Sequence, residues 1–211
     1  MTETPWMGVV GAVLFEAYLL AHPALDAASV RNSPYAVIHM IGAAAMALIV
    51  VGMLGIAQSI WPRVGRYGKI AYRMAFVGSV LWVGLMFFDA FVNPVLAAYA
   101  PELVHSGIER EIALYGSALI LAGLCLILFI TGYVGLAISM ARHGLLALPT
   151  AALLALGAVL FGVGPLAHGV DPRLVERIGG SLFAIGFVIL MRGRRDQSAD
   201  RIDSRTGFRA I

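Results

Sequence analysis

The chain has 211 residues, of which 60% are hydrophobic and only 13% are charged, and its mean hydropathy is +0.88. Water-soluble globular proteins carry about 25% charged residues, so this composition excludes a soluble enzyme, a disordered chain, a collagen and a nucleic-acid-binding module. The formal net charge of +3 fits the flanks of membrane spans better than a nucleic-acid interface, and the sequence predicts an integral membrane protein.

Six apolar stretches follow one another along the chain. A helix needs about 20 apolar residues to cross a bilayer core of about 30 Å. The stretches therefore predict an all-α, polytopic protein with six transmembrane helices, at about 6–22, 35–59, 70–98, 112–140, 146–167 and 178–191. They form one domain, 1–192. The polar, Arg-rich tail 193–211 has no apolar period, and we expect it to be disordered or to lie on anionic headgroups.

Basic residues predict the orientation, because positive charge that flanks spans stays in the cytoplasm. Most of the 15 Lys and Arg residues fall on one side of the six expected spans: Arg63, Arg66, Lys69, Arg73, Arg142, Arg192, Arg194, Arg195, Arg201, Arg205 and Arg209. The other side has Arg31, Arg110, Arg173 and Arg177. Both termini are therefore predicted to be cytoplasmic.

The first span is expected to be retained, because the chain begins without the positively charged segment of a secretory signal peptide. The expected location is a cell membrane, as in a multi-pass protein of the bacterial inner membrane. The lipid bilayer is the expected partner, other membrane subunits or a homo-oligomer remain open, and no nucleic acid is expected.

Three short segments resemble one another at equal spacing: 14–18 (LFEAY), 87–91 (FFDAF) and 160–164 (LFGVG). Each lies near the end of an odd-numbered span. One interpretation is an internal repeat, in which three helical hairpins run parallel to one another. The alternative is chance similarity between apolar sequences built from the same few residue types.

Two acids, Glu16 and Asp89, lie deep inside expected spans and at the same position of the proposed repeat. A charge at the bilayer centre costs about 2.5–3.5 kcal/mol on insertion scales, so such residues usually face the bundle interior and often mark function. Asn93 shares a helix face with Asp89, just before Pro94, whose ring frees a backbone carbonyl one turn earlier.

These positions predict an outward-facing polar pocket with a ligand-binding set of Glu16, Asp89, Asn93, His39 and Tyr18. The alternative is that the carboxyl groups only join helices, through hydrogen bonds to Tyr18, Tyr99, Ser117 or a histidine.

Four histidines are expected on the outer side and are weak candidates for metal ligands: His22, His39, His105 and His168. Imidazole is the common axial ligand of membrane haem and a common metal ligand, but no HxxxH or HExxH spacing occurs. Cys125 is the only cysteine, which excludes an intrachain disulfide and cysteine-ligated clusters. A haem or metal cofactor therefore stays open.

No Walker loop, nucleophile elbow or dinucleotide-binding fingerprint is present, so no catalytic residue is predicted. Three functions remain. The first is binding or transport of a proton, a cation or a small polar ligand. The second is a non-catalytic accessory or assembly subunit of a larger membrane complex. The third is a haem- or metal-binding redox protein that uses the outer histidines.

Overall fold

The computed structural model describes residues 4–104, 108–164 and 171–206, and every element in these ranges is helical. Five of the helices are long and apolar enough to cross a membrane, and α6 is a shorter apolar helix of 16 residues. The prediction of an all-helical fold is thus confirmed, and the long apolar helices are compatible with a multi-pass membrane protein. The elements are α1 (Thr4–Ala21), α2 (Ala27–Asn32), α3 (Tyr35–Ile60), α4 (Gly65–Tyr99), the 3-10 helix η1 (Pro101–Leu103), α5 (Ile108–Arg142), α6 (Leu148–Val163) and α7 (Pro172–Thr206).

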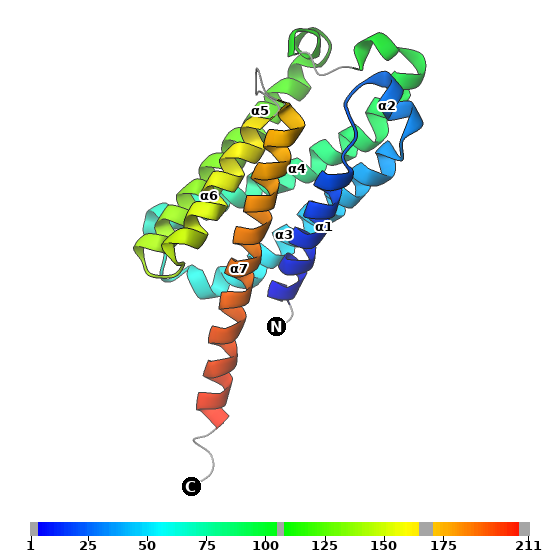
Figure 1. The fold of residues 1–211 in the computed structure, drawn as a ribbon. Coiled ribbons are helices and arrows are strands. Elements are labelled where there is room, and N and C mark those ends of the chain that lie inside the picture. The colour runs from blue at the N-terminus through cyan, green and yellow to red at the C-terminus, as the bar shows by residue number, and fades with distance from the viewer. Residues whose placement is uncertain (1–3, 105–107, 165–170, 207–211) are drawn as a thin grey trace.

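Three antiparallel helix pairs make up the bundle. The most extensive contacts lie within α1–α3, α4–α5 and α6–α7, and contacts of α3 with α4, α5 with α6 and α1 with α7 close the pairs into a ring (Figure 1). The helices α1, α4 and α6 finish at one end of the bundle, where α3, α5 and α7 begin; we call it the loop end. At the opposite end, the turn end, short turns join α3 to α4 and α5 to α6.

Several boundaries differ from those expected. Helix α4 already begins at Gly65. The basic residues Arg66, Lys69 and Arg73 therefore lie on its first turns rather than in a connection. Gly65 adopts a φ of +65°, which glycine tolerates, and this lets the chain turn directly from α3 into α4. Helix α6 ends at Val163, before the Gly164–Pro165 pair and short of the end expected near residue 167.

Helix α7 does not end with its apolar run but continues to Thr206. The tail is therefore helical rather than disordered as far as that residue. The short helix α2 was also not expected. Its N-cap is Asp26, whose carboxylate accepts hydrogen bonds from the backbone N–H and the hydroxyl of Ser29, at 2.8 and 2.7 Å, as side chains at helix N-caps commonly do.

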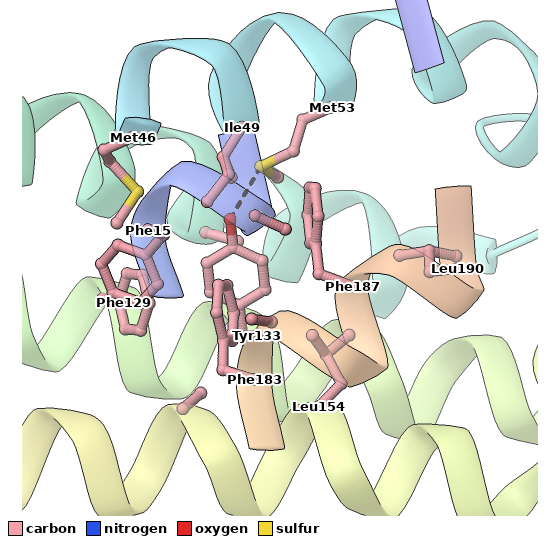
Figure 2. Close-up of a cluster of buried hydrophobic side chains, with 14 of the residues drawn as sticks. Phe15, Met46, Ile49, Met53, Phe129, Tyr133, Leu154, Phe183, Phe187 and Leu190 are labelled. Carbon is pink, nitrogen blue, oxygen red and sulfur yellow. Dashed lines mark hydrogen bonds between the residues drawn. The ribbon is translucent and has the colours of Figure 1, made fainter. Parts of the chain in front are cut away.

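Aromatic side chains fill the centre of the bundle (Figure 2). Tyr133 of α5 is fully buried, and its ring packs against Phe129 of its own helix and Phe183 of α7. Its hydroxyl lies 3.0 Å from the hydroxyl of Ser79 on α4 and 3.1 Å from the sulfur of Met53 on α3. The side chain of Tyr133 thus joins α5 to α3, α4 and α7. The aromatic core fills the axis of the bundle.

Glycines let the helices of a pair approach closely. A side chain at Gly132 would collide with the backbone of Ala75, and one at Gly157 would collide with the backbone of Phe183. Small residues at such contacts allow van der Waals packing between membrane helices, where the hydrophobic effect contributes little. These contacts fix α4 against α5 and α6 against α7, and so set the relative positions of residues at the helix ends.

Candidate functional site

Polar and aromatic side chains from α1, the connection after it, α3 and α4 meet at the loop end. We call this group the loop-end cluster; it consists of Tyr18, His22, Tyr35, His39, Asp89 and Asn93. The last turn of α1, the connection that follows it, the first turns of α3 and the end of α4 around Pro94 supply these residues.

Asn93 connects two helices within the cluster. Its side-chain nitrogen donates to the hydroxyl oxygen of Tyr35 on α3 and to a carboxylate oxygen of Asp89 on its own helix, both at 3.0 Å. The side chain is only 8% exposed. Asp89 and Asn93 therefore share one face of α4, as their spacing predicts, and that face looks toward α3.

His39 is held in one orientation. Its ring nitrogen Nδ1 lies 2.9 Å from the carbonyl oxygen of Tyr35, and its ring stacks on that of Tyr35 with centroids 4.0 Å apart. A carbonyl can only accept a hydrogen bond, so Nδ1 carries the proton and Nε2 of the neutral ring carries the lone pair. The residue is 1% exposed, which leaves a buried nitrogen base in the cluster.

His22 lies directly beside His39. The two ring centroids are 4.9 Å apart and the planes are inclined by 64°, while the ring of Tyr18 meets both imidazoles edge-on. Nδ1 of His22 is buried and makes no hydrogen bond within the described residues. Burial, followed by the neighbouring His39, lowers the pKa of His22 to about 4. His22 is therefore neutral at pH 7.

The spacing of the imidazoles of His22 and His39 indicates which cofactor, a metal ion or a haem, the pair could bind. Rings this close fit two ligands on adjacent positions of one metal ion, at N–metal distances of about 2.0–2.1 Å. They do not fit the opposed axial positions of a haem iron, which would hold the rings farther apart. Among the described residues, no three or more His, Cys, Asp or Glu side chains are placed to hold a metal. His105 and His168 lie outside the described residues.

Glu16 makes its contact on a different side of α1. Its Oε1 accepts a hydrogen bond of 2.7 Å from the hydroxyl of Ser181 on α7, and Oε2 is buried without a hydrogen-bond partner among the described residues. Residues two apart on a helix do not share a face, so Glu16 and Tyr18 point to different neighbours. The structure joins Tyr18, His39, Asn93 and Asp89 in one cluster, whereas the hydrogen bond of Glu16 leads to α7.

Arg177, on the first turns of α7, binds the end of α1. Its guanidinium donates to the carbonyl oxygens of Leu19, Leu20 and His22, at 3.1, 3.3 and 3.4 Å. The last carbonyls of a helix lack partners within the helix, and a cation there also interacts favourably with the helix dipole. Arg177 thereby fixes the backbone that carries His22.

Sequence reasoning did not place Tyr35 or Arg177 in the site. The spacing of Tyr35 and His39, four residues apart near a predicted helix start, was the available signal for the first. No local signal exists for Arg177, because its acceptors lie more than one hundred residues away in the chain. Searches with this chain find no matching family model, no matching curated protein and no matching solved structure.

Proposed function

We propose that this is a membrane protein that binds a small cation at the loop-end cluster, with a proton or a small polar ligand as the nearest alternatives. One observation carries the proposal: a continuous series of contacts runs from Asp89 through Asn93, Tyr35 and His39 to His22. Three chain segments contribute to it: the connection after α1, the first turns of α3 and the distant end of α4. A purely structural contact between two helices needs only one such bond.

The chemistry of the cluster favours a positively charged ligand. Asp89 provides a carboxylate, and the two neutral imidazoles provide nitrogen lone pairs, which suit transition-metal ions. The rings of Tyr18 and Tyr35 also belong to the cluster, and aromatic rings attract organic cations. Asn93 orients the carboxylate through its hydrogen bond to Asp89. In this proposal Glu16 acts at a distance from the ligand, by joining α1 to α7.

The proposal includes a topology. Helix α6, at about 24 Å long, would be the sixth span despite falling short of a bilayer core of about 30 Å. The concentration of Lys and Arg at the turn end and on α7 would place both termini in the cytoplasm and the loop end outside. The three helix pairs agree with an origin in a repeated hairpin, which stays a hypothesis.

Binding is favoured over open conduction. The aromatic core around Tyr133 occupies the axis of the bundle below the cluster. A ligand that enters from the loop end would therefore stop at the cluster unless the helices rearranged. Transport would require such a second arrangement.

The first test uses Zn²⁺ as a probe of the imidazole pair, by titration calorimetry on protein purified without a polyhistidine tag. We expect saturable binding near one ion per chain, at least about tenfold weaker in His39→Gln and His22→Gln. His143→Gln is the matched control, because Nδ1 of His143 also bonds the carbonyl four residues earlier, at the turn end. Equal binding by all variants would contradict the proposal.

A second candidate function is an accessory subunit, favoured by the length of α7. Its 35 residues make a helix about 52 Å long, which exceeds the thickness of a bilayer core, and in Figure 1 its C-terminal part projects beyond the bundle. Such an arm could bind a partner. Loss of a co-purified membrane partner on truncation after Gly193 supports this function, and an identical set of co-purified proteins contradicts it.

A further inference from the structure

A tryptophan ring at the turn end is flanked by two positively charged side chains that have no role in the proposed function. Trp61, in the turn after α3, has two cations over its ring: Nζ of Lys69 at 5.6 Å and the guanidinium of Arg73 at 5.2 Å from the centroid. The ring is held from another side by Tyr72, which it meets edge-on at 5.8 Å. The hydroxyl of Tyr72 in turn donates to the carbonyl of Met53. The contact with Tyr72 therefore fixes the position of the Trp61 ring.

Among the side chains that the structure describes, these positive charges have no acidic partner. The chain contains no Asp or Glu between Asp26 and Asp89 or between Glu111 and Asp171, and these two stretches form both turns at this end. Neither Lys69 nor Arg73 forms an ion pair with a described side chain. Two like charges that converge on one ring repel each other, so the arrangement favours an anion between them.

An apolar surface adjoins the two cations. Ala57, Gln58, Trp61 and Pro62 line an open hollow at the end of α3, and most of its lining is apolar. A ligand that fits both features has a negatively charged head and an apolar remainder. Trp rings are also common at the level of lipid headgroups, and basic pockets between membrane helices on the cytoplasmic side bind anionic headgroups.

We propose that the turn end holds an anionic phospholipid, with its phosphate between Lys69 and Arg73 and its glycerol and upper acyl chains on the hollow beside Trp61. The assignment is independent of the loop-end cluster. It differs from a general attraction of the basic turn end to anionic lipid, because Arg63 and Arg66 carry the same charge at the same end and are exposed, but only Lys69 and Arg73 lie over the ring.

The experiment measures quenching of tryptophan fluorescence by lipids with brominated acyl chains. The full chain is reconstituted in phosphatidylcholine vesicles that contain a minor fraction of brominated phosphatidylglycerol, or the same fraction of brominated phosphatidylcholine. The signal lost in Trp61→Phe isolates the contribution of Trp61 from those of Trp6 and Trp82. We expect phosphatidylglycerol to reach half-maximal quenching of Trp61 at about a tenfold lower fraction than phosphatidylcholine does.

Variants separate the site from general charge. The preference for phosphatidylglycerol should disappear in Lys69→Gln/Arg73→Gln and persist in Lys69→Arg/Arg73→Lys, which keeps both charges. The control Arg63→Gln/Arg66→Gln removes as much charge from the same end and should retain most of the preference. Equal quenching of the unmodified protein by the two lipids would overturn the proposal. So would an equal loss in the Lys69/Arg73 and Arg63/Arg66 glutamine variants. Relief of quenching by inorganic phosphate, at matched ionic strength, would assign the site to free phosphate instead.

Discussion

The side-chain nitrogen of Asn93 lies 3.0 Å from the hydroxyl oxygen of Tyr35 and joins α4 to α3 at the loop end. The same nitrogen donates to Asp89, so this amide positions a phenol and a carboxylate at once. Because Tyr35 also holds His39 through its carbonyl oxygen and its ring, one side chain on α4 supports the geometry of the whole cluster.

Replacing Asn93 with Leu should therefore destabilise the bundle. The hydroxyl of Tyr35 and the carboxylate of Asp89 would each lose a donor, and we expect a loss of about 1–2 kcal/mol in the free energy of unfolding. Equilibrium unfolding in mixed detergent micelles measures it. Asn32→Leu, at an exposed position of α2, is the control and should change stability by less than about 0.5 kcal/mol. Similar effects of the two substitutions would show that the Asn93 bonds contribute nothing.

Glu16 and Ser181 provide a second prediction. Ser181→Ala removes the only hydrogen bond of Glu16 in the described structure and should cost about 1–2 kcal/mol in stability. Glu16→Gln keeps a carbonyl acceptor for the Ser181 hydroxyl and should cost less. Cation binding at the loop-end cluster should survive both changes. A greater loss in Glu16→Gln than in Ser181→Ala would instead indicate that the carboxylate charge itself is needed.

Arg177 should stabilise the last turn of α1 against local unfolding. Without the guanidinium, the carbonyls of Leu19, Leu20 and His22 lose their shared donor. In Arg177→Met we expect amide hydrogen exchange in the last turn of α1 to quicken by about tenfold or more, which corresponds to about 1.4 kcal/mol. Arg173→Met, which removes an exposed arginine paired with Asp171, should leave this turn unchanged. Equal exchange rates in all three proteins would contradict the capping role.

Stability should depend on pH through His22. Its pKa falls from 6.5 to about 4 on folding, chiefly because of burial. Between these values the unfolded chain binds a proton on His22 that the folded chain does not, so the contribution of His22 to stability is full above about pH 6.5 and declines as the pH falls toward 4. The decline should amount to about 1–3 kcal/mol. Thermal unfolding at pH 7.5 and pH 5 measures it, and His22→Gln should reduce the difference; an unchanged difference would assign the pH dependence to other groups.

Much of the fold follows from composition and periodicity. Apolar stretches of membrane length predict the positions of the long helices, because no other backbone structure except a closed barrel satisfies its hydrogen bonds in lipid. The spacing of Asp89 and Asn93 likewise predicts their common face. The length of an apolar stretch and the spacing of two residues are local properties, so they can be read without knowing the tertiary contacts.

Other features depend on contacts that local sequence does not encode. Glu16 and Asp89 have equivalent positions in the proposed repeat, yet the hydrogen bond of Glu16 leads to α7 and that of Asp89 to its own helix. The capping of α1 by Arg177 needs the ring to close between α1 and α7. The sequence after the apolar run of α7 has no apolar period, so it does not predict that the helix continues to Thr206.

The cation site at the loop-end cluster can be tested by the thermal stability of the detergent-purified, tag-free protein in the presence of Zn²⁺, Ca²⁺, Na⁺ or choline. A ligand that binds only the folded state adds about 2.7 kcal/mol at one hundred times its dissociation constant. We expect at least one cation to raise the unfolding temperature by several degrees, the variant His39→Gln/Asp89→Asn to lose this increase, and His143→Gln to retain it. No stabilisation by any probe, or the same stabilisation in all three proteins, would contradict a cation site at the loop-end cluster.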